Sequence, residues 1–469
     1  MQTGTAGGLI TGSCPFSAQV GSSGVYLSPD GGHWTQPTYG GGSSAAGSGC
    51  TFTIRTLPGY CAAGLVSNGD PAIAFGPQPD GQGGFTLANG ARAYYANLAF
   101  PLGNLSVGAL LAVSRSDDDG ASWFAPVVAS STDNPIGEFN DKEAIWADKT
   151  PASPCFGSAY ASWTLFPGSP SFSPELVDRI MFTRSTDGGT TWSKAQILTP
   201  SYNNNAVGGR QGSMIRSLPD GTVIVVWEDA LSKTSTIVAA VSHNCGRTFS
   251  ARIPISTLVD IPSPFPGTSF RSDSFPSIDT DGRGVAYVSW SDFSSGTAVV
   301  RLSSSGDGGQ TWTAPVAVSN PRSGNAFFNA TGVSPDGKHV VVSYLNLITT
   351  AASPGAGAAS YGSVFGVSTD GGRTFSRQAL SSTSGDPDGS STNSLAAQFL
   401  GDYTSIVSTN TAAYPIWTDS RNAVPCAAVD SYRAAVAAGQ SAPKPDPDLA
   451  NQCPMGFGNT DIYAAVIAY

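Results

Sequence analysis

The stretch STDGGTTW, Ser185 to Trp192, decides the fold, because close copies of it recur along the chain. The other copies are SPDGGHW (Ser28 to Trp34), SDDDGASW (Ser116 to Trp123), SHNCGRTF (Ser242 to Phe249), SGDGGQTW (Ser305 to Trp312) and STDGGRTF (Ser368 to Phe375). The aromatic residues that end successive copies are 57 to 89 residues apart. Repeats at such a period are typical of solenoids, propellers and arrays.

Each copy has the composition of a tight turn between two strands. Apolar or alternating runs precede most copies and follow them, such as RIMFTRS before Thr186 and KAQILT after Ser193. The Asp can accept hydrogen bonds from the N–H groups of its own turn, and the Gly adopts the positive φ that other residues resist. Asn244 replaces the Asp in the fourth copy and keeps an acceptor oxygen. The pattern therefore predicts a series of β-hairpins.

The pattern Ser-x-Asp-x-Gly-x-Thr-aromatic resembles the Asp-box, or bacterial neuraminidase repeat, of sialidase-like β-propellers. The resemblance implies an all-β fold of four-stranded antiparallel blades, with each box joining the third and fourth strands on the face opposite the active site. First and second strands can be read between the boxes, as in SFPSIDTDG and GVAYVSWSD. Counting third strands predicts seven blades. The alternative is a six-bladed ring whose last blade is completed by N-terminal strands.

We expect one domain over residues 1–469, because each blade needs neighbours to bury its faces. The first blade, 1–57, is incomplete by this count. The last blade carries an insertion, 422–458, with one short helix from Asp430 to Gln440.

Composition limits the classes of partner. Charged residues are only 12% of the chain, the net charge is −10, and no basic stretch occurs. This argues against a nucleic-acid partner. No apolar run is long enough to span a membrane, and the start MQTGTAGG has no signal-peptide pattern.

The seven cysteines indicate an oxidising, extracytoplasmic setting, and so a secreted protein whose signal peptide is not in this chain. Cys426 and Cys453 flank the insertion, and we expect them to form a disulfide. Two of Cys14, Cys50 and Cys61 are candidates to staple the N-terminal region. We expect Cys155 and Cys245 to be buried thiols.

The three histidines, His33, His243 and His339, lie near no plausible nucleophile in the sequence. A Ser-His-Asp triad or a His-built zinc site is therefore not expected, and catalysis must depend on carboxylates, Tyr, Arg or Lys. Such residues concentrate where first strands begin and second strands end. They are Asp70, Asp141, Lys142, Glu143, Arg210, Gln211, Glu228, Asp229, Arg271, Asp273, Asp292, Asn329, Asp402, Tyr403, Asp419 and Arg421.

The resemblance to sialidases assigns roles within this set. In that family three arginines bind the substrate carboxylate, a Tyr is the nucleophile, a Glu activates the Tyr, and an Asp is the general acid and base. The roles carry over as a clamp of Arg210, Arg271 and Arg421, the pair Tyr403 and Glu228, and the acid/base Asp141. We add Lys142 and Asp402 to the substrate-binding residues. The early Phe-Arg-Ile-Pro motif of sialidases is absent, and Arg252-Ile253-Pro254 follows a box, on an outer strand.

Three functions remain open at this point. The first is a secreted glycoside hydrolase resembling exo-α-sialidases, which cleaves terminal acidic sugars from a glycan. The second is a non-catalytic propeller that binds glycans or proteins. The third is a polysaccharide lyase or other glycosidase that uses Tyr403 with Lys142 or an Arg.

Two weaker signals allow two interpretations each. The segment DPDGS, Asp386 to Ser390, could bind calcium, although a plain turn is favoured because no closing Glu follows; no other metal or cofactor is expected. The recurring Trp163, Trp227, Trp290 and Trp417 could stack on sugar rings, although packing between blades is favoured.

Overall fold

The computed structural model describes the greater part of the chain. The described residues are 2–4, 24–28, 33, 57–60, 62–101, 108–130, 139–166, 178–199, 209–231, 234–349, 359–390, 395–447 and 451–469. They group into two compact units, and each is described by itself. Unit 1 contains residues up to Thr257 with Thr280–Ala286 and Ser305–Trp312; unit 2 contains Leu258–Asp279, Tyr287–Ser304 and Thr313–Tyr469.

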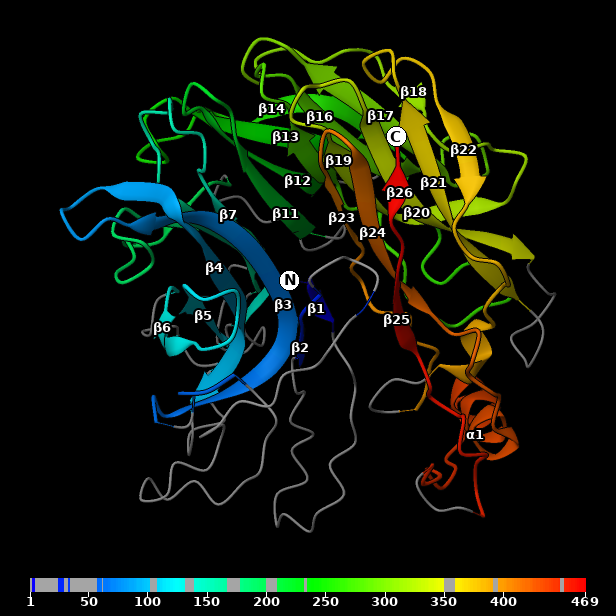
Figure 1. The fold of residues 1–469 in the computed structure, drawn as a ribbon. Coiled ribbons are helices and arrows are strands. Elements are labelled where there is room, and N and C mark those ends of the chain that lie inside the picture. Colours follow the sequence, from blue (N-terminus) through cyan, green and yellow to red (C-terminus); the bar gives the residue numbers. More distant parts are fainter. Residues whose placement is uncertain are drawn as a thin grey trace. The chain divides into compact units, whose positions relative to one another are not determined.

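Unit 1 is built from three four-stranded antiparallel sheets, which we number as blades 1 to 3 (Figure 1). Blade 1 has β3 (Leu65–Pro79), β4 (Phe85–Pro101), β5 (Leu110–Ser116) and β6 (Phe124–Val128). Blade 2 has β7 (Phe139–Ala147), β8 (Ala159–Phe166), β9 (Arg179–Ser185) and β10 (Gln196–Ile197). Blade 3 has β11 (Gly209–Ser217), β12 (Val223–Leu231), β13 (Thr234–Ser242) and β14 (Ile253–Leu258). A separate two-stranded sheet pairs β1 (Gln2–Gly4) with β2 (Gly24–Tyr26).

Unit 2 contains blades 5 and 6 and most residues of blade 4. Blade 4 has β15 (Ser277–Thr280), β16 (Ala286–Asp292), β17 (Val299–Ser305) and β18 (Val316–Ala317). Blade 5 has β19 (Asn325–Val333), β20 (Val340–Thr349), β21 (Ser360–Ser368) and β22 (Ser376–Ala379). Blade 6 has β23 (Ser405–Ser408), β24 (Ala412–Asp419), β25 (Asp461–Ala464) and β26 (Ile467–Ala468).

The described residues therefore form the blades of an all-β propeller, and the blades number six. The favoured count of seven is wrong, and the alternative count of six is right. In blade 6 both β25 and β26 pair with β24, and the described N-terminal strands β1 and β2 form their own sheet, so they do not complete this blade as the alternative expected. The seven-blade count gave the first motif copy a blade of its own. In the described part of 1–57, the only strands are β1 and β2. The single-domain prediction, with its insertion at 422–458, stays a prediction.

The repeated motif forms the hairpin turn between the third and fourth strands of blades 1 to 5. In the third copy the Asp187 carboxylate accepts from the backbone N–H groups of Thr190 and Thr191 at 3.0 and 2.9 Å. Its second oxygen accepts from the Thr191 hydroxyl at 2.6 Å. Asn244 makes the equivalent bond in the fourth copy, where its Oδ1 accepts from the N–H of Thr248 at 2.9 Å. The conserved pattern of Asp or Asn and Thr thus closes the turn, as expected.

The second strands of blades 2, 3, 4 and 6 each place one tryptophan inside the core. Trp163, Trp227 and Trp290 are at most 1% exposed, and Trp417 is 4% exposed. Trp163 packs with Tyr94, Leu111 and Ile145 in the core of blades 1 and 2. The core interpretation of these tryptophans is therefore confirmed, and stacking on a sugar is ruled out by their burial.

Two disulfides are present among the described residues. Cys426 and Cys453 are bonded as predicted, across the insertion that carries α1 (Ala427–Ala437). Cys155 and Cys245 are also bonded, so the expectation that they are free thiols is wrong. Cys14, Cys50 and Cys61 lie outside the described residues. No helix in the described ranges is long and apolar enough to cross a membrane.

The Cys155–Cys245 bond has a physical signature in the repeat. Cys245 has a φ of 58°, in the left-handed region, at the motif position where Gly188, Gly308 and Gly371 also have positive φ; Asp119, at the same position of the second copy, has a φ of 57°. A non-glycine residue is disfavoured there. The disulfide joins this turn position of blade 3 to Cys155 of the preceding blade.

Candidate active site

A β-bulge interrupts the first strand of blades 1, 2, 3 and 5 at one recurring position. The pairing register shifts between Gly69 and Ala72, Asp141 and Ala144, Gln211 and Met214, and Phe327 and Ala330. The first residue of each bulge has a positive φ; these residues are Asp70, Lys142, Gly212 and Phe328. Bulges redirect side chains and are frequent beside active sites, and strained backbone clusters there too. Two of the predicted polar positions, Asp70 and Lys142, are thus bulge residues.

Asp141 lies at the bulge of blade 2 and pairs with the carboxyl of Asp70 from blade 1. The two side chains share a hydrogen bond. Burial, this hydrogen bond and the charge of Asp70 raise the pKa of Asp141 to about 7, against a smaller opposing effect of Lys142. Both carboxyl residues remain partly exposed. The pair therefore holds a proton near neutral pH at a position that solvent reaches.

Neighbouring buried groups fix the start of the blade 2 strand. Asn140, 1% exposed, donates from its amide to the Ala109 carbonyl at 2.7 Å and accepts from the Trp163 indole N–H at 2.6 Å. The backbone N–H of Lys142 donates to the Asp141 carboxylate at 3.0 Å. These contacts hold the Asp141 backbone and side chain in one geometry.

Glu143, the second residue of the same bulge, is 4% exposed, and neither of its carboxyl oxygens has a hydrogen-bond partner among the described residues. Burial, followed by the charge of Asp70, raises its pKa well above the ordinary 4.5. The equivalent bulge residues in other blades bond to the preceding blade. Ser213 contacts the Ser162 hydroxyl at 2.9 Å, and Asn329 donates to the Ser289 hydroxyl at 2.9 Å.

The pairing register explains why Glu143 differs. Ser162 and Ser289 each precede the buried tryptophan of a second strand. In blade 1 the corresponding residue is Ala96, whose side chain offers no oxygen. A carboxyl at this point is therefore buried without compensation, which is costly to stability and typical of functional sites.

Arg210 lies in blade 3 and is fully buried. Its Nε donates to the Asp229 carboxylate at 3.2 Å, and its Nη1 donates to the Asp178 carbonyl at 3.3 Å. Neither side chain of the Arg210–Asp229 pair is exposed. Arg252 contacts the other Asp229 oxygen at 2.7 Å. In this arrangement Arg210 organises the start of blade 3 and does not reach solvent. Its predicted role in substrate binding stays a prediction, as does that of Glu228, which is 8% exposed.

Arg271 and Asp402 form an ion pair in unit 2 with two hydrogen bonds between guanidinium and carboxylate. The Arg271 side chain is 60% exposed, whereas Asp402 is 3% exposed. The guanidinium also lies over the Phe399 ring, 5.2 Å from its centroid. Tyr403, the residue after Asp402, is 40% exposed. The sequence prediction thus placed Arg271 and Asp402 in one site, and the structure brings them into contact.

Arg421 is held by its own strand end in blade 6. It donates to both Asp419 oxygens, at 2.9 and 2.6 Å, and lies 4.2 Å from the centroid of the Tyr463 ring. Its remaining Nη1 donates to the Ser382 hydroxyl at 3.3 Å. The fork that would bind a substrate carboxylate is therefore occupied by Asp419.

The predicted residues thus divide between the two units. Asp141, Lys142, Arg210 and Glu228 belong to unit 1; Arg271, Asp402, Tyr403 and Arg421 belong to unit 2. Sequence reasoning gave Asp70 and Glu143 no role, and it missed Phe399. The first two had a usable signal, since both stand at first-strand starts in a chain poor in charge. Phe399 had none.

A metal site has no support in the described part of the chain. No group of three or more His, Cys, Asp or Glu side chains there is arranged to hold a metal ion. The segment considered for calcium forms a short 3-10 turn, Pro387–Gly389, in which Asp386 accepts from the N–H of Asp388 at 2.9 Å. The favoured turn interpretation of this segment agrees with that geometry.

Comparison with known proteins gives the family. The sequence profile of the BNR repeat-like domain matches residues 111–415, about two thirds of the chain. The protein belongs to this family. The resemblance to sialidase-like propellers of the BNR type is therefore confirmed. No curated protein matches the sequence.

Several solved structures are similar in fold. The Hadza microbial sialidase Hz136 is 15% identical, with a TM-score of 0.47, over 79% of this chain and 67% of that one. The leech intramolecular trans-sialidase is 10% identical, with a TM-score of 0.44, over 74% of this chain and 64% of the enzyme. The GH93 α-L-arabinofuranosidase of Fusarium graminearum is 15% identical, with a TM-score of 0.41, over 70% and 93%. Likeness at this level carries no argument about activity.

Proposed function

We propose that the protein is a glycoside hydrolase whose general acid is Asp141. The supporting observation is the Asp70–Asp141 carboxyl pair at a partly exposed bulge, where burial, the hydrogen bond to Asp70 and its charge raise the pKa of Asp141 to about 7. Glycoside hydrolysis needs a carboxylic acid that is still protonated at working pH to protonate the departing oxygen. Asp70, as the hydrogen-bond partner, retains the proton on Asp141 until the glycosidic oxygen accepts it.

The finer proposal is a secreted exo-glycosidase that removes terminal acidic sugars. The resemblance supplies the remaining roles: Tyr403 as nucleophile, Glu228 as its base, and Arg271 as the ligand of the sugar carboxylate. Of the three clamp arginines, Arg271 has by far the most exposed side chain, at 60%. Two disulfides among the described residues favour an oxidising compartment, which agrees with secretion.

Turnover of fluorogenic aryl glycosides tests the proposal. The panel includes an α-sialoside, an α-L-arabinofuranoside and a β-glucuronide, and the variants are Asp141→Asn and Asp141→Ala. Removing a general acid lowers the rate by about 10²- to 10⁴-fold. The loss is expected to be larger for glycosides with a poor leaving group, because these depend most on protonation. Asp119→Asn, an exposed carboxyl in a motif turn, is the matched control.

Two outcomes would contradict the proposal. One is turnover by Asp141→Asn at the wild-type rate on every leaving group. The other is absence of turnover by the wild type on a wide panel, combined with tight binding of a glycan, which would identify a carbohydrate-binding propeller. Activity on a neutral glycoside alone would support the glycoside hydrolase proposal and contradict the proposed specificity for acidic sugars.

A further inference from the structure

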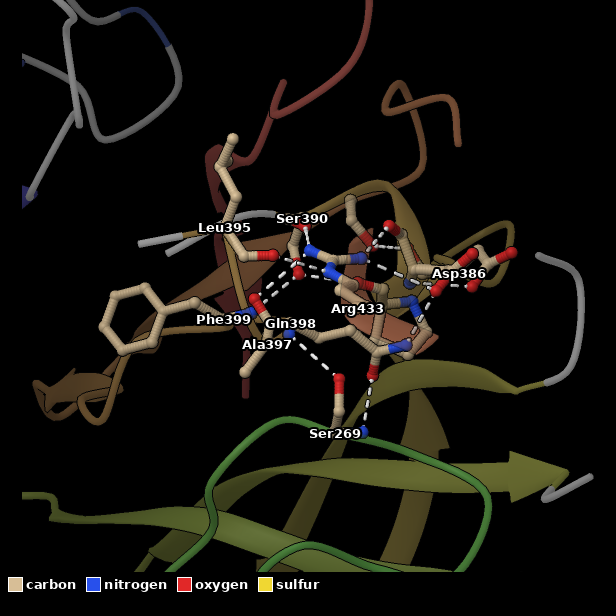
Figure 2. Close-up of polar contacts among 11 residues, drawn as sticks. Ser269, Asp386, Ser390, Leu395, Ala397, Gln398, Phe399 and Arg433 are labelled. Carbon is tan, nitrogen blue, oxygen red and sulfur yellow. Dashed lines mark hydrogen bonds and ion pairs between the residues drawn. The ribbon is translucent and has the colours of Figure 1, made fainter. Parts of the chain in front are cut away.

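The insertion of blade 6 contains a buried arginine that the proposed chemistry does not use. Arg433 lies on α1 and is 8% exposed. Its guanidinium donates to four backbone carbonyls: Asp388 at 3.0 Å, Ser390 at 2.6 Å, Leu395 at 3.2 Å and Ala397 at 3.1 Å. Figure 2 shows the side chain at the centre of these contacts. The Arg433 side chain on α1 therefore connects two backbone segments, 388–390 and 395–397, by hydrogen bonds.

The cluster continues to the segment that precedes Arg271. Gln398 donates from its amide to the Asp388 carboxylate at 2.9 Å. It is also bonded twice to Ser269: its Oε1 accepts from the Ser269 N–H at 3.0 Å, and its backbone N–H donates to the Ser269 hydroxyl at 3.0 Å (Figure 2). Two hydrogen bonds thus join Gln398 to Ser269, close in sequence to Asp402 and Arg271, which form the ion pair.

A second, apolar anchor joins the same parts. Leu395, 5% exposed, packs with Val429 of α1 and with the Cys426–Cys453 disulfide. The disulfide closes the insertion, so that α1 is attached to this cluster at both its polar and its apolar side. The chain then runs from Gln398 through Phe399, whose ring underlies Arg271, to Asp402, which pairs with it.

We propose that Arg433 is a positioning residue, which holds 395–403 in place and thereby sets the orientation of Arg271 and Asp402 for substrate. The kinetic part of this inference rests on the proposed function; the structural part does not. Arginine suits this role because its planar fork bonds several fixed acceptors at once and stays charged. Hydrogen bonds from a charged donor are stronger than those between neutral groups, and more so when they are buried.

The test compares Arg433→Met and Arg433→Lys with the control Arg373→Met, an exposed arginine of a motif turn in unit 2. Amide hydrogen exchange is the first readout. In both Arg433 variants the exchange rate of peptides covering 395–404 and 268–272 is expected to rise about tenfold or more. Local opening of these segments costs less free energy when the hydrogen bonds of the guanidinium are absent. Exchange in β19 to β21 is expected to stay as in the wild type. The double variant Cys426→Ala/Cys453→Ala is expected to loosen the same peptides.

Kinetics with the best glycoside of the panel are the second readout. A misplaced binding group is expected to lower kcat/KM by about 100-fold, through both KM and kcat. The basic limb of the pH profile, assigned to Asp141, is expected to keep its pKa, because Arg433 belongs to another unit. A general loss of stability would instead reduce the active fraction and leave KM unchanged.

Unchanged exchange of 395–404 in Arg433→Met would overturn the inference, and so would a rise spread evenly over all peptides of unit 2. If the wild type turns over no glycoside while exchange responds as expected, the proposed function fails and the positioning of 395–403 by Arg433 stands.

Discussion

Glu143 and Ser213 occupy the same bulge position in neighbouring blades, yet within the described ranges only the Ser213 side chain has a hydrogen-bond partner. The Ser213 hydroxyl contacts the Ser162 hydroxyl at 2.9 Å, whereas both carboxyl oxygens of Glu143 are buried and have no hydrogen-bond partner in the part of the chain that the structure describes. A serine or an asparagine at this position ties two blades together. A glutamic acid at this position lacks that stabilising contact. Proteins commonly lose stability at functional sites, where a residue must be strained or must have a shifted pKa.

The Glu143→Met variant is therefore expected to be more stable than the wild type at pH 8, by about 1 to 3 kcal/mol, since an apolar side chain of similar volume removes the uncompensated carboxyl. The native pKa of Glu143 is raised, so its contribution to stability is greatest below about pH 4.5, its ordinary value, and falls as the pH rises. The advantage of the variant is accordingly expected to shrink at pH 5.

Urea unfolding at the two pH values measures this difference. Ser213→Ala is the matched control and is expected to lose about 1 kcal/mol, because it removes a satisfied hydrogen bond. A Glu143→Met protein less stable than the wild type at both pH values would show that Glu143 stabilises the fold.

The Asp of the repeated turn is expected to contribute through its acceptor oxygen more than through its charge. Asn244 already replaces it in the fourth copy with equivalent bonds. Asp307→Ala is expected to cost about 1 kcal/mol, as for a lost cap, and Asp307→Asn distinctly less.

The pH dependence of stability separates the contribution of the Asp307 charge from that of its acceptor oxygen. Hydrogen bonds from Thr311 lower the pKa of Asp307 to about 2. Its ionised form therefore stabilises the native state above its ordinary pKa of 3.8, and this part is lost as the pH falls through about 2. Thermal unfolding of the wild type and Asp307→Asn between pH 2 and 7 measures it. Equal losses for Asn and Ala at pH 7 would refute the acceptor argument.

The Cys155–Cys245 disulfide is expected to stabilise unit 1 by about 2 to 4 kcal/mol, since it closes a loop with a sequence separation of 90. In a Cys155→Ala background, Cys245→Gly is expected to be about 1 kcal/mol more stable than Cys245→Ala. Glycine adopts the positive φ at this turn position without strain. Denaturant unfolding of the two double variants gives the comparison, and an advantage for the Ala variant would contradict it.

Sequence alone predicted the blades well, because periodic turns and alternating strands are local signals. Strands such as β12 and β16 lie where TVIVVWED and GVAYVSWSD indicated. The blade count failed at the N-terminus, where a turn motif was counted without the strands that make a sheet. The Cys155–Cys245 bond was missed although a cysteine stood at a glycine position of the repeat. That signal was present in the sequence, since the aligned copies place Cys245 opposite Gly188, but it does not name the partner cysteine.

Part of the candidate site could be predicted from the sequence for the same reason. Asp141, Arg271 and Asp402 stood at strand starts, where polar residues gather. Their partners depend on contacts between blades or loops: Asp70 reaches Asp141 from the preceding blade, and Phe399 underlies Arg271. The burial of Arg210 depends on Asp229 and Arg252, which are distant in sequence. No local pattern predicts such pairings.

The pH dependence of hydrolysis follows from the carboxyl pair. Since Asp141 must be protonated to act as the acid, kcat/KM is expected to fall as the pH rises through about 7. Asp70→Asn removes the charge that helps to raise this pKa, and asparagine tolerates the positive φ at position 70. The basic limb of its pH–rate profile is therefore expected at lower pH than in the wild type. If the basic limb of the Asp70→Asn profile lies at the same pH as in the wild type, Asp70 does not raise the pKa of the catalytic acid.

Direct titration of the Asp141 carboxyl by ¹³C NMR, with Asp141→Asn used to assign its resonance, tests the central claim without any substrate. We expect a midpoint near pH 7 in the wild type and a clearly lower midpoint in Asp70→Asn. A midpoint near 4 in both proteins would contradict it.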